Sequence, residues 1–145
     1  MLKYFLNEKA TKLNLELKVP RAGDAGFDLP CLEDTEIPVA GFALVPTGVH
    51  LSIPEGWVGL LRDRSSMALK GATIVAGVID ASYRGEVKIA MHNLGKQPLV
   101  LKVGERIAQC LVVPHLAGSE SLRVNSEAEL GDTERGSGGF GSTGK

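Results

Sequence analysis

The sequence is short of cysteine, aromatic residues and net charge, and these shortages exclude several classes of protein. Its two cysteines, Cys31 and Cys110, are far apart and form no CxxC motif, which excludes a disulfide scaffold and a zinc ribbon. The formal net charge is −1, so a basic surface that binds nucleic acid through many phosphate contacts is not expected. No apolar run approaches the roughly 18 residues of a membrane-spanning helix, and residues 1–6 are too short for the apolar part of a signal peptide. We therefore expect no membrane or nucleic-acid partner and a cytoplasmic location, or the host cytoplasm if a phage encodes the chain.

The spacing of proline predicts an all-β fold. Prolines recur every eight to ten residues at positions 20, 30, 38, 46 and 54, as in the turns between the short strands of a β-sandwich or barrel. Val49, Leu51 and Ile53 alternate with polar neighbours, which predicts a half-buried strand. One short helix is expected at residues 65–69, capped by Ser65 or Ser66. Strands are expected at residues 3–6, 13–19, 35–37, 42–53, 57–61, 86–92, 99–103 and 106–113.

Glycine is unevenly distributed along the chain. Of 18 glycines, six fall in the last fifteen residues, GDTERGSGGFGSTGK. This pattern predicts a single β-domain over residues 1–130 and a flexible C-terminal segment over residues 131–145. Aromatic residues make up only 5% of the chain. A β-domain with so few of them has a thin core and strand edges to protect, so we expect it to form oligomers.

Two segments combine glycine or hydroxyl groups with charge. Residues 22–29, AGDAGFDL, place Asp28 after two glycines; taken alone, the segment is explained by a loop with ordinary turn residues. Residues 62–71, RDRSSMALKG, bring together the guanidinium of Arg64 and the hydroxyls of Ser65 and Ser66. Such a group suits a phosphate, because arginine offers forked donors and short hydroxyls reach single oxygens. The alternative is a helix N-cap beside a surface arginine.

A third segment, GVIDASYRGEV at residues 77–87, carries a carboxylate after an apolar run. Asp80 follows this run, and Tyr83 lies in a hairpin that closes at Gly85. A carboxylate at the end of a buried strand can be held rigidly, as a general base must be. The alternative is a hairpin turn with an Asx hydrogen bond.

The glycine-rich tail is the fourth segment. GGFGSTGK matches the spacing of a P-loop, but it lacks the preceding strand and the Ser or Thr and helix that a P-loop requires after its lysine. Arg135 and Phe140 favour a binding role, because glycine backbone N–H groups can approach phosphates and an aromatic ring can stack on a base. A tail without fixed structure is the alternative.

Taken together and in order, these segments resemble the trimeric dUTP pyrophosphatase (dUTPase) family over residues 13–145. The motifs that carry the resemblance are AGDAGFDL, RSSMALKG, GVIDASYRGEV, GERIAQCLVVP and RGSGGFGSTGK. The resemblance implies a jelly-roll-like distorted β-barrel, a homotrimer, and hydrolysis of dUTP to dUMP and pyrophosphate with Mg²⁺. This activity limits uracil in DNA and supplies dUMP for dTTP synthesis. In the family each active site takes the first, second and fourth motifs from one subunit, the third from another and the tail from the third.

The resemblance also implies a role for each candidate residue. Asp80 would deprotonate the water that attacks the α-phosphorus, while Mg²⁺, Arg64 and Ser65 would neutralise charge on the leaving pyrophosphate. Asp28 would hold metal-bound waters, with no direct protein ligand to Mg²⁺. Tyr83 would lie under the deoxyribose and exclude a 2′-hydroxyl. The other implied substrate-binding residues are Ser66, the uracil-binding segment Gly77, Val78 and Ile79, Lys88, Gln109 beside the phosphate chain, Arg135 at the γ-phosphate with Gly141, Ser142 and Thr143, and Phe140 on the uracil ring.

Three positions depart from the commonest family pattern. Ser66 stands where glycine is usual, Asp63 where proline is frequent, and Ser82 where a second acidic residue is often found. Arg-Ser-Ser is typical of the homologous dCTP deaminases, but these need a glutamate where Ala90 falls, and alanine cannot shuttle a proton. A regulatory protein that keeps the fold without turnover is the remaining alternative. The chain has no inserted segment that would support it, and every expected catalytic residue is present.

Overall fold

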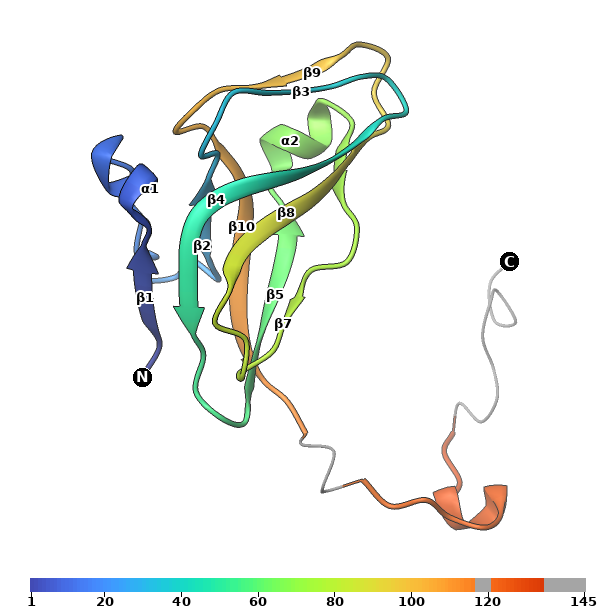
Figure 1. Ribbon diagram of the computed structural model, residues 1–145. Helices are drawn as coiled ribbons and strands as arrows, with labels where there is room; N and C mark the ends of the chain where they lie inside the picture. The colour runs from blue at the N-terminus through green and yellow to red at the C-terminus, as the bar shows by residue number, and fades with distance from the viewer. Residues whose placement is uncertain (117–120, 135–145) are drawn as a thin grey trace. The chain divides into compact units, whose positions relative to one another are not determined.

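The strands of the unit Met1–His115 pair into three sheets. The structure, a computed structural model, describes residues 1–116 and 121–134. One four-stranded sheet has the order β1-β4-β8-β6, the other has the order β2-β10-β5-β7, and β3 pairs with β9. In Figure 1, β4 and β8 cross in front of β10, so the sheets form layers, and the all-β prediction is confirmed. The strands are β1 (Lys3–Leu6), β2 (Phe27–Pro30), β3 (Thr35–Ile37), β4 (Phe42–Ser52), β5 (Trp57–Asp63), β6 (Ala72–Ile74), β7 (Val78–Ile79), β8 (Glu86–Asn93), β9 (Leu99–Leu101) and β10 (Arg106–Pro114).

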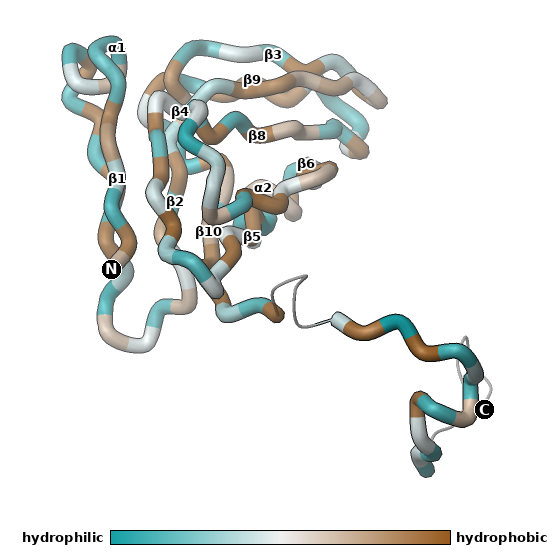
Figure 2. Tube along the Cα trace, turned by 60° about the horizontal axis from the view of Figure 1, so that its bottom comes forward, coloured by the Kyte–Doolittle hydropathy of each residue, from teal (hydrophilic) through white to brown (hydrophobic). Residues whose placement is uncertain are grey.

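The core is aliphatic and is supplied by alternate residues of the strands. Val49, Leu51 and Ile53 are buried while the residues between them are half-buried, as the alternation predicted. Val87 and Ile89 of β8 are buried in the same way. Figure 2 shows hydrophobic and hydrophilic residues alternating along the strands. In β8 the buried face is lined by Val87, Ile89 and Met91, whereas Lys88 on the other face is exposed and available for a site or a partner.

The structure has more helix than the one segment that the sequence predicted. α2 (Ser65–Leu69) lies where a helix was expected, but α1 (Glu8–Lys12) and the 3₁₀ helix η2 (Glu127–Leu130) were not expected. α1 begins because the side chain of Asn7 accepts the N–H of Ala10 at 2.9 Å, which satisfies a free donor of the first turn. None of the helices among residues 1–116 and 121–134 is long and apolar enough to span a membrane.

The strand expected at residues 13–19 is wrong. Leu13 ends α1, and Asn14 has a φ of 53°, a left-handed conformation that directs the chain away from an extended path. Within this range a single bridge joins Lys18 to Asp28 of β2. β2 and β6 were not predicted, and β7 was anticipated only as the apolar run before Asp80.

A bulge of residues 47–49 interrupts the pairing of β4 with β8. Pro46 pairs with Lys88, and the next pair joins His50 to Glu86, so four steps on β4 match two on β8. Gly48 has a φ of 71°, and a Cβ there would lie 2.6 Å from Cβ of Ala10 on α1. Glycine is therefore needed at this position, both for the backbone conformation and for the contact with α1. We call residues 47–49 the β4 bulge.

Cys110 gives the core a pH dependence. Burial raises the pKa of its thiol from 9.0 to about 12. Between about pH 9 and about pH 12 the thiol is protonated in the native protein but ionised in the unfolded chain. Its contribution to stability is therefore complete below about pH 9 and is lost as the pH rises towards about 12. We expect the free energy of unfolding to fall by about 1.4 kcal/mol per pH unit in this window because of this thiol. Urea denaturation at about pH 8 and about pH 10.5 measures the slope, and Cys110→Ala should flatten it. Equal slopes for both proteins would contradict the prediction.

Candidate active site

A polar cavity of about 510 Å³ lies against β2, β10 and the start of α2. We call it the Arg64 cavity. Four of its side chains are basic (Lys18, Arg21, Arg64 and Arg106) and two are acidic. This excess of positive charge in a concave surface favours a small polyanion, although the net charge of the chain is −1. The full lining is Lys18, Val19, Pro20, Arg21, Gly23, Asp24, Ala25, Gly26, Asp28, Arg64, Ser65, Arg106 and Gln109.

The guanidinium of Arg64 is held in place by hydrogen bonds. Its Nε donates to Oδ1 of Asp28 at 2.9 Å, and its Nη1 donates to the carbonyl of Arg106 at 2.8 Å. The other carboxylate oxygen of Asp28 accepts from Nη1 of Arg106 at 3.1 Å. Asp28 thus bridges two guanidinium groups and fixes the direction of Arg64 before any ligand binds, which reduces the cost of ordering it. The sequence did not single out Arg106, although it lies in the fourth motif.

Gln109 joins this cavity because its strand pairs with both neighbours. In β10 it lies opposite Asp28 of β2 on one side and Arg62 of β5 on the other. Its Nε2 donates to the carbonyl of Asp63 at 2.9 Å, which holds the side chain at the end of β5. The carboxylate of Asp63 accepts the N–H of Ile74 at 2.7 Å. Asp63 therefore links β5 to β6. A proline at this position would lack both the carboxylate that accepts this hydrogen bond and a backbone N–H.

The two serines lie at the start of α2, but neither caps it. Arg64 is the N-cap residue and its side chain makes no capping bond, so the expected cap at Ser65 or Ser66 is wrong. Both serines are exposed, and Ser65 lines the Arg64 cavity whereas Ser66 does not. Neither hydroxyl therefore makes a capping hydrogen bond to α2, and the hydroxyl of Ser65 is open to a ligand.

A second cavity, of about 260 Å³, contains the third motif. We call it the Asp80 cavity. It is lined by Leu44, Val78, Ile79, Asp80, Tyr83, Glu86 and Lys88, a mixture of apolar and charged side chains. Gly77, which precedes Val78, has a φ of 111°, and its carbonyl accepts the N–H of Leu61 at 2.8 Å. Asp80 follows β7 directly and is exposed, and the N–H of Tyr83 donates to its carbonyl at 3.0 Å. The hairpin expected here is wrong, because β7 pairs with β5 whereas β8 pairs with β4 and β6, so residues 80–83 form a turn that connects two sheets.

The two cavities share no residue and lie far apart along β5. Ile79 pairs with Gly59, and Arg64 follows five residues later. At the rise of a strand, five residues correspond to about 16 Å. Within one copy of the chain, the carboxylate of Asp80 and the guanidinium of Arg64 therefore belong to different places on the surface.

The family model described as dUTPase matches residues 16–144 of this chain. The chain belongs to the dUTPase family. It is 49% identical over 127 residues to the deoxyuridine 5′-triphosphate nucleotidohydrolase of Wolinella succinogenes, with 86% of this chain and 83% of that protein covered. The protein of the same name from Corynebacterium jeikeium is 45% identical over 143 residues, with 94% and 92% covered.

Solved dUTPase structures show the same fold. The dUTPase of Staphylococcus bacteriophage 80alpha with dUPNHPP superposes with a TM-score of 0.81 at 30% identity, with 100% of this chain and 99% of that chain covered. The native EIAV dUTPase superposes with a TM-score of 0.73 at 34% identity, with 88% and 98% covered. The predicted dUTPase fold is thereby confirmed.

Of the site residues expected for a dUTPase, those in the first four motifs can be placed. Arg64, Ser65, Gln109 and Asp28 share one cavity, while Asp80, Val78, Ile79, Tyr83 and Lys88 share the other, and Gly77 precedes Val78 without lining that cavity. The expected tail residues, Arg135, Phe140, Gly141, Ser142 and Thr143, lie outside the described residues. The tail boundary at residue 131 likewise stays a prediction.

The Arg64 cavity suits Mg²⁺ held by water better than Mg²⁺ held by protein ligands. Among residues 1–116 and 121–134, no three His, Cys, Asp or Glu side chains gather as a metal cage. The charge of Asp28 is already offset by Arg64 and Arg106, which weakens direct attraction for a cation. Each of its carboxylate oxygens still has a lone pair for a water molecule. Mg²⁺ characteristically keeps several waters and takes phosphate oxygens from its substrate, so these residues fit the ion.

Proposed function

We propose that this chain hydrolyses dUTP to dUMP and pyrophosphate at sites that combine the Arg64 cavity of one copy with the Asp80 cavity of another. The activity follows from membership of the dUTPase family at up to 49% identity. The observation that supports the shared site is the separation of the two cavities along β5, about 16 Å. A general base must lie within hydrogen-bonding reach of the proton that it removes, so Asp80 serves the Arg64 cavity of a neighbouring copy.

The two cavities suit the two halves of dUTP. The Arg64 cavity, with its excess of basic side chains and the hydroxyl of Ser65, matches a triphosphate. The Asp80 cavity is smaller and includes the apolar Leu44, Val78 and Ile79, which match a base and a sugar. Tyr83 covers the sugar in this arrangement and leaves no room for a 2′-hydroxyl. Lys88 contributes a positive charge at the rim beside the phosphates.

Asp80 accepts the proton of the attacking water and aligns that water with the α-phosphorus. Arg64, held by Asp28, stabilises the charge that develops on the leaving pyrophosphate, and Gln109 and Ser65 position the phosphate chain. Mg²⁺, when bound, neutralises phosphate charge, with Asp28 accepting hydrogen bonds from its waters. In the tail, Arg135, Ser142 and Thr143 bind the γ-phosphate, and Phe140 stacks on uracil.

Measuring pyrophosphate release tests the activity directly. Purified protein with Mg²⁺ should release pyrophosphate from dUTP and little from UTP, dTTP or dCTP, because the ring of Tyr83 excludes the 2′-hydroxyl and a tight pocket excludes the methyl group and amine. Chelation of the metal should abolish release. Deamination of dCTP would instead support a deaminase, against the expectation from Ala90 on β8. No turnover with dUTP under these conditions would overturn the proposal.

A further inference from the structure

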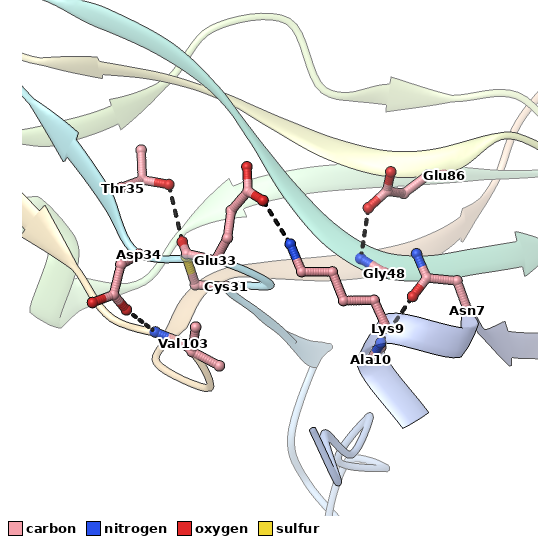
Figure 3. Close-up of polar contacts among 10 residues, drawn as sticks. All are labelled: Asn7, Lys9, Ala10, Cys31, Glu33, Asp34, Thr35, Gly48, Glu86 and Val103. Carbon is pink, nitrogen blue, oxygen red and sulfur yellow. Dashed lines mark hydrogen bonds and ion pairs between the residues drawn. The ribbon is translucent and has the colours of Figure 1, made fainter. Parts of the chain in front are cut away.

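Glu86 is anchored to β4 by its side chain. The N–H of Gly48, in the β4 bulge, has left the regular ladder and donates to Oε1 of Glu86 at 2.7 Å. Figure 3 shows this carboxylate reaching from β8 to Gly48, with Asn7, the N-cap residue of α1, on the other side of Gly48. The N–H of Asn7 donates to the carbonyl of Gly48 at 2.9 Å. The bulge is therefore fixed between α1 and the side chain of Glu86.

A second residue of the bulge strengthens the same junction. Thr47 is fully buried, and its hydroxyl donates to the carbonyl of Val87 at 2.5 Å. The same hydroxyl accepts the N–H of Val49 at 3.1 Å. The backbone groups that the bulge removes from the ladder thus bond to the side chains of Thr47 and Glu86. A buried polar group without such a partner would cost stability, so the bulge and these two side chains depend on each other.

The main chain of Glu86 holds the aromatic ring of the third motif. Its carbonyl accepts the hydroxyl of Tyr83 at 2.9 Å. The ring then lies so close to Gly85 that a Cβ at that position would clash with the ring and its hydroxyl. The N–H of Tyr83 in turn donates to the carbonyl of Asp80. One residue therefore connects the β4 bulge, through its carboxylate, to the Asp80–Tyr83 turn, through its carbonyl.

We propose that Glu86 is a positioning residue, which locks the Asp80–Tyr83 turn to the β4 bulge and thereby fixes the ring that selects deoxyribose over ribose. The inference rests on the proposed function for its kinetic readout only. Glu86 lines the Asp80 cavity but acts through Tyr83, since its carboxylate is bonded to Gly48 and its carbonyl to the Tyr83 hydroxyl. Loosening this lock widens the space under the sugar, so a 2′-hydroxyl becomes tolerated.

The kinetic test compares dUTP with UTP in three variants. Glu86→Ala removes the acceptor for Gly48, and we expect it to lower the ratio of kcat/KM for dUTP to that for UTP by about 10-fold or more. Glu86→Gln keeps an acceptor oxygen and should retain the wild-type ratio. Tyr83→Phe removes only the donor to the Glu86 carbonyl and should lower the ratio without disturbing β4. Glu36→Ala, at an exposed position on β3, is the matched control.

A structural measurement tests whether Glu86 fixes the Tyr83 ring, independently of whether the protein hydrolyses dUTP. The chain has two tyrosines, Tyr4 and Tyr83, so protein labelled with 3-fluorotyrosine gives two assignable ¹⁹F signals. In Glu86→Ala the Tyr83 signal should shift and broaden while that of Tyr4 stays in place, whether or not the protein turns over dUTP. The proposal is overturned by an unchanged Tyr83 signal in Glu86→Ala, by an unchanged substrate ratio in Tyr83→Phe, or by an equal loss of activity towards both nucleotides in Glu86→Ala.

Discussion

Replacing Asp80 with asparagine is expected to lower kcat for dUTP by about 10²- to 10⁴-fold, the usual contribution of a general base. The amide keeps the size of the side chain but cannot accept a proton from water at neutral pH. Asp80 is exposed at the end of β7, and its own carbonyl, not its side chain, holds the turn to Tyr83. The substitution should therefore remove the chemistry and leave the fold and the turn intact.

A binding measurement distinguishes loss of the general base from loss of the nucleotide-binding site. Titration with a non-hydrolysable dUTP analogue should give nearly the wild-type Kd for Asp80→Asn, because the triphosphate is held in the Arg64 cavity. Asp34→Asn is a suitable control, since that carboxylate pairs with Lys102 and lies outside both cavities. Turnover by Asp80→Asn within about 10-fold of the wild type would assign the base to another group.

The long strands of the fold were predictable from the sequence, because their alternating patterns span enough residues to be recognised. β4 and β8 span 11 and 8 residues, and their buried positions were evident from Val49, Leu51, Val87 and Ile89. The prediction failed at residues 13–19, where a helix capped by Asn7 comes first and its last turn uses the apolar Leu13. Local hydrophobicity alone could not distinguish these outcomes, because the cap contributes only about 1 kcal/mol and its partner is a backbone group.

The site was predictable as a set of residues and not as a geometry. The motifs identified Asp28, Arg64 and Asp80, but the bond between Asp28 and Arg64 joins residues 36 positions apart, and that between Asp28 and Arg106 joins residues 78 positions apart. Such pairs depend on the order β2-β10-β5-β7, which no local pattern encodes. The register of β5 with β7 also separates Asp80 from Arg64. The family resemblance implied a site shared between copies, and this pairing of strands supplies the physical reason for it.

Mixing two inactive variants is expected to restore activity, and this is the sharpest test of a shared site. Arg64→Ala removes the guanidinium of one cavity, and Asp80→Asn removes the carboxylate of the other. Each homo-oligomer lacks one group at every site. In a trimer with sites between neighbours, every mixed assembly has one site with Arg64 from an Asp80→Asn copy and Asp80 from an Arg64→Ala copy. Each mixed trimer then has one working site of three, so the mixed assemblies are expected to show about a third of the wild-type activity.

The experiment requires co-expression with two different tags and purification through both, so that only mixed assemblies are assayed. A site built within one copy predicts no recovery, because every chain in the mixture carries one defect. The two single variants, each co-expressed with itself, supply the baseline. Recovery also depends on neither substitution unfolding its subunit: Arg64→Ala leaves Asp28 paired with Arg106, and Asp80 is solvent-exposed, so both variants should assemble. Activity that stays at the baseline in doubly purified assemblies would place Asp80 and Arg64 in the chemistry of a single copy and would exclude the shared site.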